Sequence, residues 1–459
     1  MTNISCDNKN ASQGWLGRAI ALCQNGWYEA AIACLDHAET TDPDAWQYRG
    51  YVLGKLGRFE AAIACYEKTF ELGCTDAKAW YNCGQALIKL KRYDTAIAQY
   101  DQAIKLDPQN PKPWYQRGKA LAYLGRYQEA LRSLEKTVEL QPKYYKAWGY
   151  RAQILGKLGS YHEAIKSVNQ ALRFEPDDVH LWNFKAYGLW KLDQHSEALE
   201  SINTALALLP KGNALTPKSY QPWCMRGMIL GSMGEFERAS ASFTQALEMQ
   251  PNEMSALLNQ AIVLRKLGRL EAALSYIDHA LTIDPQNFKL WVVRALILWE
   301  LKRVEEALKS LDRALLLHLN HPKVWQYRGT ILDSIQRHDE AIGSYIRALM
   351  IEPYDSEGWV SLGSALQNAG RFDEAIVSYD KALGIEPDDA GVFYYEACCY
   401  AMQNNPDWAL EHLRRAIALA PGYREIAAND SVFEKLHQDF RFQALIHSCS
   451  VASVMTEIG

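Results

Sequence analysis

A tryptophan that returns at a fixed interval is the sequence feature that most constrains the fold. Successive tryptophans stand 34 residues apart at Trp46, Trp80, Trp114, Trp148 and Trp182, and again at Trp291, Trp325 and Trp359. Trp15 and Trp223 mark two further copies, and Leu257 and Phe393 stand where a tryptophan is missing. A period of this length predicts a stack of twelve similar small modules in place of a few independent globular domains.

Other positions recur with the tryptophan, which we number place four of a 34-residue unit. Place eight is always Ala or Gly, place twenty is Ala in all twelve copies, and place 32 is Pro in nine. Apolar residues fall at helical spacing in two stretches of roughly 13 residues, with a glycine such as Gly125 between them in most copies. Each unit is therefore predicted to be a pair of closely packed helices, the second ending at the proline.

This combination of Trp, small residues and Pro at fixed places resembles the tetratricopeptide repeat over residues 12–423. Stretches such as Pro113-Trp114-Tyr115-Gln116-Arg117-Gly118 are also similar to repeat arrays of cyanobacterial proteins. The resemblance implies an all-α fold, a right-handed α-α superhelix, in which the first helix of each repeat lines a concave groove that holds an extended peptide. It also implies a non-enzymatic scaffold that binds a peptide segment or partner protein, for example in complex assembly.

Departures from the period divide the array. Repeats 1–6 occupy 12–210 and repeats 7–12 occupy 220–423. Between them, residues 211–219 are rich in Gly, Asn, Pro and Ser and are expected to form an inserted loop. This loop is either a tolerated surface insertion or a hinge between the two sets of repeats.

The two ends of the chain depart from the repeat as well. Residues 1–11 are polar, and we expect them to be disordered. Only 31 residues separate Trp15 from Trp46, which predicts a shortened second helix or a tight turn in repeat 1. Residues 424–459 carry apolar residues at helical spacing, and we expect helices there that cap the last repeat.

Composition excludes several classes of function. The formal charge of −5 argues against a dedicated nucleic-acid binder, and no window is apolar enough for a membrane span. No secretion signal is evident, and the ten cysteines form no CxxC pair, so we expect a cytoplasmic, reducing location. His318 and His321 lack partners at metal-ligand spacing, and no nucleotide-binding or hydrolase motif is present. We therefore predict no enzyme activity, no cofactor and no metal site.

By the resemblance, places two, five, six, nine, twelve and thirteen of each repeat face the groove. Lysines recur at places two and thirteen, aromatic residues at five, nine and twelve, and asparagine at place six, which in this family bonds the peptide backbone. The candidate groove residues are Tyr51, Lys78, Tyr81, Asn82, Lys89, Lys112, Tyr115, Lys146, Lys157, Tyr187, Trp190, Lys191, Asn259, Lys289 and Trp299.

Charge suggests what these residues attract. Residues 43–210 contain 23 Lys+Arg and 18 Asp+Glu, a net charge of +5, so we predict an acidic partner at repeats 2–6. The alternative is that these lysines only solvate exposed helix ends. Likewise, the aromatic residues, including Trp190 and Trp299, either anchor a ligand or pack on the adjacent repeat.

Two further considerations limit the prediction. Only two of the five residues of the family's clamp for chaperone tails are present in repeats 2–4, so that specificity is disfavoured. Arginine recurs at place seven, and we interpret it as structural, with its guanidinium reaching acidic residues of a neighbouring helix. An accessory subunit of an enzyme complex and a helical-repeat RNA binder remain alternative functions.

Overall fold

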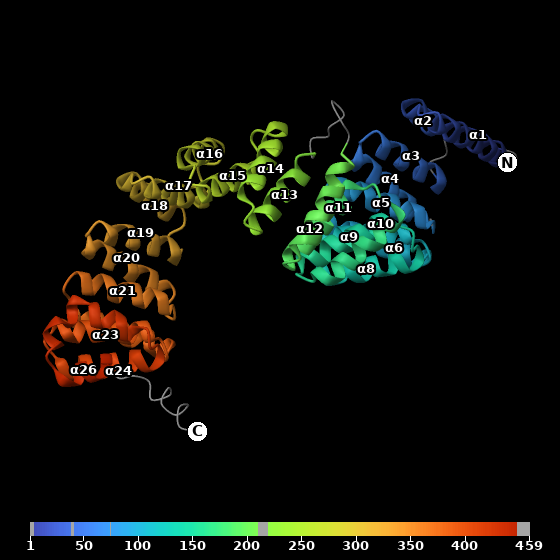
Figure 1. Cartoon of the computed structure of the whole chain (residues 1–459). Coiled ribbons are helices and arrows are strands. Elements are labelled where there is room, and N and C mark those ends of the chain that lie inside the picture. Colours follow the sequence, from blue (N-terminus) through green and yellow to red (C-terminus); the bar gives the residue numbers. More distant parts are fainter. Residues whose placement is uncertain (1–3, 38–40, 74, 210–218, 448–459) are drawn as a thin grey trace, which may run out of the picture. The chain divides into compact units, whose positions relative to one another are not determined.

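The described chain is built from twelve helical hairpins, one per predicted repeat, and contains no strand. The structure, a computed structural model, describes residues 4–37, 41–73, 75–209 and 219–447 (Figure 1). The all-α fold predicted from the period is therefore confirmed.

The first helices of the twelve repeats are mostly 13 residues long. They are α1 (Ile4–Gln24), α3 (Pro43–Lys55), α5 (Ala77–Lys89), α7 (Pro111–Tyr123), α9 (Tyr145–Lys157), α11 (Val179–Lys191), α13 (Gln221–Ser232), α15 (Met254–Lys266), α17 (Phe288–Glu300), α19 (Pro322–Ser334), α21 (Ser356–Asn368) and α23 (Ala390–Met402).

The second helices pack antiparallel on the first. They are α2 (Tyr28–Leu35), α4 (Phe59–Glu71), α6 (Tyr93–Leu106), α8 (Tyr127–Leu140), α10 (Tyr161–Phe174), α12 (His195–Ala207), α14 (Phe236–Met249), α16 (Leu270–Ile283), α18 (Val304–Leu317), α20 (His338–Ile351), α22 (Phe372–Ile385) and α24 (Pro406–Leu419).

Local chemistry explains where each hairpin begins and turns. Several first helices start after an Asp or Asn whose side chain accepts a bond from a backbone N–H in the first turn, as Asp76 does from Lys78 at 2.9 Å. At the turn between the helices the backbone takes a positive φ, which glycine adopts without strain, as at Gly125 (φ 75°). Lys91 (φ 58°) takes the same conformation where the glycine is missing.

The repeated tryptophan fastens each repeat to the loop before it. The indole N–H of Trp148 donates to the carbonyl oxygen of Pro142 at 2.9 Å, and Trp182 donates to Pro176 at 2.7 Å. The same bond to a proline recurs at Trp114, Trp291 and Trp359, and Trp325 donates to Leu319, which stands at the proline's place. The two most regular features of the repeat, Trp and Pro, are therefore parts of one interaction.

The residue at place eight is matched to the one at place 24. A Cβ built on Gly84 would lie 2.5 Å from a ring carbon of Tyr100, so the ring rests directly on the helix backbone. Gly50, Gly227, Gly329 and Gly363 face rings in the same way. Repeats with Ala at place eight instead carry Val, Ile or Leu at place 24, as in the fully buried pair Ala295 and Leu311.

Arginine at place seven joins three helices. Arg117 contacts Asp101 of α6 at 2.7 Å and Ser133 of α8 at 2.7 Å, so it links the second helix of the preceding repeat to that of its own. Arg294 and Arg328 repeat this arrangement with an Asp and a Ser each 16 residues away. We call this arrangement the arginine bridge, and it confirms the structural interpretation of the recurring arginine.

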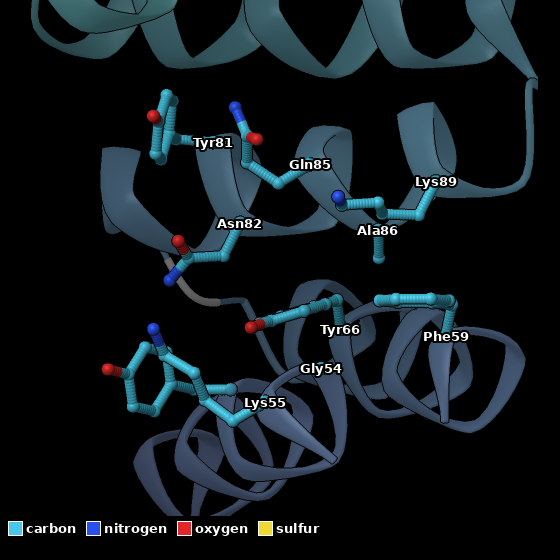
Figure 2. A pocket seen from close by; sticks show the side chains of 10 residues that line it. Gly54, Lys55, Phe59, Tyr66, Tyr81, Asn82, Gln85, Ala86 and Lys89 are labelled. Carbon is cyan, nitrogen blue, oxygen red and sulfur yellow. The ribbon is translucent and has the colours of Figure 1, made fainter. Parts of the chain in front are cut away.

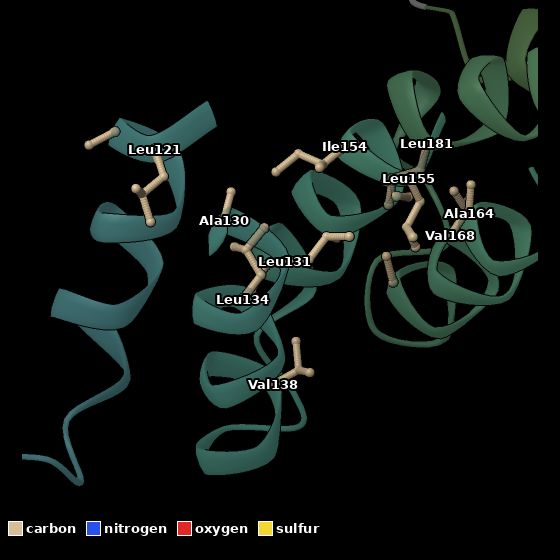
Figure 3. Close-up of a cluster of buried hydrophobic side chains, with 14 of the residues drawn as sticks. Leu121, Ala130, Leu131, Leu134, Val138, Ile154, Leu155, Ala164, Val168 and Leu181 are labelled. Carbon is tan, nitrogen blue, oxygen red and sulfur yellow. The ribbon is translucent and has the colours of Figure 1, made fainter. Parts of the chain in front are cut away.

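Apolar side chains continue the core from one repeat to the next. In Figure 3, Leu134 and Val138 of α8 lie between Leu121 of α7 and Ile154 of α9, and all four are buried. The helices form two compact units, residues 1–249 and 250–459. Across the insertion within the first unit, α12 and α13 pack together. Residues 211–218 of that insertion lie outside the described residues, and the proposed hinge stays a prediction.

The ends of the array differ in three ways from an ideal repeat. Helix α2 has only 8 residues, which confirms the shortened second helix of repeat 1. Helix α1 begins at Ile4, so residues 4–11 are helical where we expected disorder; no Pro or Gly interrupts that segment, and residues 1–3 lie outside the described residues.

The C-terminal cap is formed by α25 (Tyr423–Asn429), η2 (Ser431–Leu436) and α26 (Phe440–His447). Phe433 and Phe442 are fully buried in the cluster that covers repeat 12. Residues 448–459 of the predicted cap lie outside the described residues.

Candidate peptide-binding groove

The first helices of repeats 2–6 present a continuous surface within the first unit. Neighbouring first helices contact one another, α3 with α5, α7 with α9 and α9 with α11, in addition to their contacts with second helices. They therefore lie on the more closely spaced side of the stack. We call the exposed side of α3, α5, α7, α9 and α11 the inner face.

A hollow of about 290 Å³ lies between α3, α4 and α5 on the inner face. Its lining includes four predicted residues, Tyr51, Tyr81, Asn82 and Lys89, together with Lys55. Figure 2 shows Tyr81, Gln85 and Lys89 on one side and Tyr66 and Lys55 on the other, with Asn82 between them. The hollow thus joins aromatic walls, an amide and two ammonium groups.

The base of this hollow is rigid because aromatic rings fill it. Tyr66 is 2% exposed, and a Cβ on Gly50 would lie within 3 Å of its ring. Burial raises the pKa of Tyr66, while a hydrogen bond with the Asn82 side chain works in the opposite direction. Burial likewise raises the pKa of Tyr81, which bonds with Gln116 of α7. Asn82 and Tyr81 are thereby held in place before any ligand binds.

A strip of lysines continues from the hollow along the inner face. Four of them lie over tyrosine rings: Lys55 over Tyr51 at 5.4 Å, Lys119 over Tyr115 at 5.7 Å, Lys157 over Tyr127 at 5.6 Å and Lys191 over Tyr187 at 5.8 Å. We call these four and Lys89 the lysine strip.

None of the five ammonium groups forms an ion pair with a carboxylate of the described chain. Burial and repulsion from Lys89 lower the pKa of Lys119. An array of unpaired positive charges on aromatic faces attracts anions. Lys119 was missed in the sequence because place nine was searched for aromatic residues alone, although its place in the repeat could have identified it.

Tyrosines of successive repeats touch one another along the same face. The rings of Tyr115 and Tyr144 are 5.0 Å apart, and those of Tyr115 and Tyr150 are 6.3 Å apart. Burial and the neighbouring tyrosines raise the pKa of Tyr150 to about 12, so these phenols are neutral donors at physiological pH. The inner face therefore offers uncharged hydroxyls beside its ammonium groups.

Trp190 has a packing role. Its indole N–H donates to Ser232 of α13 at 2.7 Å, and its ring lies 6.1 Å from that of Tyr187. Lys191 covers the ring at 4.4 Å. The structure thus favours the alternative in which Trp190 packs on the adjacent repeat.

The remaining predicted residues are not gathered into the hollow. Lys78, Lys112 and Lys146 are exposed near the beginnings of α5, α7 and α9. Asn259, Lys289 and Trp299 belong to the second unit, where Asn259 already donates to the backbone oxygen of Ser255 at 2.8 Å. The candidate groove is therefore the hollow and the lysine strip of repeats 2–6.

The described residues show no sign of metal, membrane or thiol chemistry. They contain no cluster of three or more His, Cys, Asp or Glu side chains suited to a metal ion, and none of their helices has the length and apolarity to cross a membrane. Cys398 and Cys399 are buried, and burial raises the pKa of both thiols to about 12. This environment suits packing and not thiol redox chemistry.

Comparison with known families identifies the repeat. Models described as tetratricopeptide repeat or TPR repeat match residues 84–125, 115–178, 151–213, 224–288, 264–329, 356–389 and 390–423. The chain belongs to the tetratricopeptide repeat family. A model of anaphase-promoting complex, cyclosome, subunit 3 also matches residues 24–103 of this tetratricopeptide repeat protein. Repeats of this family support a protein–protein interaction scaffold and are typically not catalytic.

Solved structures with similar folds include YrrB, described as a TPR protein with an unusual peptide-binding site. It is 26% identical to the tetratricopeptide repeat protein described here, over 40% of this chain and 94% of its own, with a TM-score of 0.35. The APC/C Cut9-Hcn1 hetero-tetramer matches 93% of this chain and 95% of its own at 16% identity and a TM-score of 0.39. A tetratricopeptide repeat protein from Parabacteroides merdae matches 58% of this chain and 97% of its own, at 17% identity and a TM-score of 0.42. No curated protein sequence matches the chain.

Proposed function

We propose that the chain is a non-enzymatic scaffold that binds an extended acidic segment of a partner protein along the inner face of repeats 2–6. The observation that carries this proposal is the lysine strip, five ammonium groups without a carboxylate partner among the described residues, leading from a hollow whose walls are aromatic. In a chain with net charge −5, such a local excess of unpaired positive charge favours an anionic ligand.

The hollow supplies the means to hold one residue of that segment. Tyr51 and Tyr81 provide apolar walls, Lys55 and Lys89 neutralise a carboxylate, and Asn82 offers an amide to the peptide backbone. An extended peptide exposes such groups every few residues, so it suits a face where similar side chains recur from helix to helix. As part of the same proposal, the scaffold acts in complex assembly in the cytoplasm, since buried thiols such as Cys83 suit a reducing compartment.

The test uses the full chain and a fluorescein-labelled synthetic peptide rich in Glu, with a Lys-rich peptide of equal length as the control. Binding is followed by fluorescence anisotropy at several salt concentrations. We expect the acidic peptide to bind, and its affinity to fall as salt rises because exposed charges are screened. Lys89→Glu combined with Lys119→Glu should weaken binding by about tenfold or more, because each change reverses a charge beside the peptide.

Lys266→Glu is the matched control, because Lys266 stands at place thirteen and is exposed, as Lys89 is, but belongs to α15 of the second unit. It should leave the affinity unchanged. Equal binding of both peptides, or equal weakening by Lys266→Glu, contradicts the proposal. Preferential binding of a single-stranded RNA probe over the acidic peptide would favour the RNA-binding alternative instead.

A further inference from the structure

The arginine bridge is replaced by apolar residues at one junction of the second unit. Between repeats 10 and 11, place 25 is Ile346 and place seven is Leu362, where other junctions carry pairs such as Asp312 and Arg328. They are the only aliphatic residues at these two places in the twelve repeats. Ser378 still occupies place 23, and its hydroxyl donates to the Glu374 carbonyl oxygen at 2.9 Å, as Ser344 does to Glu340.

A cleft of about 400 Å³ lies at the junction where the bridge is missing. Its apolar lining comes from Ile342 and Ile346 of α20, Trp359, Leu362 and Leu366 of α21, and Val377 of α22. Ile346 is 45% exposed and Val377 is 58% exposed, so water reaches both aliphatic side chains. We call this hollow the α20–α22 cleft.

The corresponding position between repeats 4 and 5 has a different character. There the hollow is lined by Glu135, Arg151 and Ser167, and Arg151 spans it with contacts of 3.0 Å to Glu135 and 2.6 Å to Ser167. The guanidinium crosses this hollow, which measures about 610 Å³, so it gives the lining a polar bridge without filling the space, and the α20–α22 cleft lacks that bridge. Replacing both the acidic residue and the arginine of a bridge removes its polar groups without leaving either charge unpaired.

The rim of the α20–α22 cleft is acidic. Asp373 and Glu374 border the cleft, and Asp339 lies beside them, whereas Arg371 is the one basic residue of its lining. Arg371 contacts Glu374 at 2.7 Å and Asp339 at 3.7 Å, and the Asp339 side chain remains 91% exposed. Residues 322–385, which contain α19–α22, hold six Lys+Arg and nine Asp+Glu, a net charge of −3.

We propose that the α20–α22 cleft docks an amphipathic helix of another protein, one that presents aliphatic side chains flanked by lysine or arginine. Aliphatic anchors on one helical face would cover Ile346, Leu362 and Val377, and flanking cations would approach Asp339 and Glu374. This surface is separate from the inner face of repeats 2–6, so it adds a second binding site to the scaffold.

The structure itself supplies the pattern for a variant that replaces the aliphatic lining of the α20–α22 cleft with polar groups. Ile346→Asp with Leu362→Arg restores the residue types of the arginine bridge, and Ser378 is already in place to accept the guanidinium. Because the same set is accommodated at Arg328, Asp312 and Ser344, this double variant is expected to fold with an unchanged helical circular dichroism spectrum. A loss of binding by this variant would then result from the changed cleft and not from misfolding.

The probe is a fluorescein-labelled synthetic helix with leucines on one face and flanking lysines, compared with the same helix flanked by glutamates. Anisotropy with the full wild-type chain should show binding of the lysine-flanked helix and at least about tenfold weaker binding of the glutamate-flanked one. The double variant should lower the affinity for the lysine-flanked helix by about tenfold or more. Lys89→Glu should not alter it, because Lys89 lies in the first unit.

Three results would overturn the proposal. These are no measurable binding of the lysine-flanked helix to wild type, equal affinity for both helices, or unchanged affinity in the double variant. A fourth contradicting result would come from sedimentation equilibrium of the wild-type chain alone. A dimer that the double variant abolishes would make a second copy of this chain the occupant, which also contradicts the proposed partner.

Discussion

At the scale of single residues, the pairing of place eight with place 24 determines how closely two helices approach. In five repeats glycine at place eight lets a Tyr or Phe ring contact the backbone, in repeat 4 Gly118 contacts Leu134 instead, and alanine at the same place accompanies an aliphatic partner. The repeat therefore keeps the combined volume of the two residues within limits, and neither residue can change alone without cost.

Gly84→Ala tests this pairing. The new methyl group would lie 2.5 Å from the Tyr100 ring, and overpacking of this kind lowers the free energy of unfolding by about 1–3 kcal/mol. Adding Tyr100→Leu should recover part of the loss, because Ala and Leu occupy these places at Ala295 and Leu311. Chemical denaturation measures all three chains. Gly343→Ala, with nothing near its Cβ, is the control and should not destabilise.

Glu396 is a buried carboxyl group whose charge state should affect the stability of the fold. It stands at place seven of repeat 12, where arginine is usual, and is fully buried 2.6 Å from Nδ1 of His412. Asp380, 16 residues before it, faces it as well. Burial raises the pKa of Glu396 above its ordinary value of 4.5, and the neighbouring Asp380 carboxylate raises it further, against the opposing effect of His412.

Glu396→Gln should change the pH dependence of stability. A raised pKa means that the contribution of Glu396 is fully present below pH 4.5 and is lost as pH rises through the higher folded-state value. The unfolding free energy of the variant relative to wild type should therefore increase from pH 4 toward pH 8. Glu411→Gln should give the opposite trend, because Arg414 lowers the pKa of Glu411. Parallel profiles for wild type and Glu396→Gln would contradict this account.

At the scale of helices, the arginine bridge registers a repeat against the one before it wherever place seven is arginine and its acidic partner is present, as at Arg117, Arg294 and Arg328. Arg49 reaches Asp36 at 2.7 Å although repeat 1 is three residues short, because both residues keep their places in the unit. The missing residues therefore follow Asp36, where the short helix α2 has already ended. The bridge explains why the array tolerates a change of length there.

Arg117→Met should lower the free energy of unfolding by about 1–2 kcal/mol, because the partly buried guanidinium bonds to Asp101 and Ser133. A double-mutant cycle with Asp101→Asn should give a coupling of roughly 0.5 kcal/mol, since Asp101 is 42% exposed. Arg126→Met, which removes an exposed contact with Glu129, should leave the melting temperature unchanged. Equal effects of Arg117→Met and Arg126→Met would show that the bridge adds nothing.

The sequence predicted the helices better than it predicted the side-chain partners. The Trp and Ala periods sufficed for twelve hairpins because each place has the same neighbours in every repeat. Trp190 departs from this rule, since its indole bonds to Ser232 beyond the irregular insertion, where the period gives no register. Leu362 was missed for a related reason: its importance lies in the residues that face it from α20 and α22, and the period of a single unit does not contain that information.

At the scale of the whole molecule, packing in the described chain runs between neighbouring helices. This local packing determines how far the loss of one element destabilises the others. Within the cap, Phe433 and Phe442 cover the apolar side of α23 and α24, and Tyr394 donates to Asp430 at 2.6 Å. The stability of a repeat in such an array depends on its immediate neighbours. Loss of the cap should therefore act first on repeat 12.

Deletion of residues 424–459 tests this locality. Amide hydrogen exchange should become faster in α23 and α24, which lose their covering side chains, while α3 to α6 keep their protection. The distant helices thus serve as an internal control within the same sample. Uniform loss of protection throughout the chain would instead indicate a single cooperative unit.

The arginine bridge has a further consequence for design. Several bridges pair a basic and an acidic residue 16 positions apart, as Arg294 and Asp278 do, and none of these pairs includes a lysine of the strip. Replacing such a pair with leucine and isoleucine would create an apolar cleft at another junction between repeats and would leave the existing binding surfaces unchanged. Docking sites could then be placed at chosen repeats along one polypeptide, one site per junction.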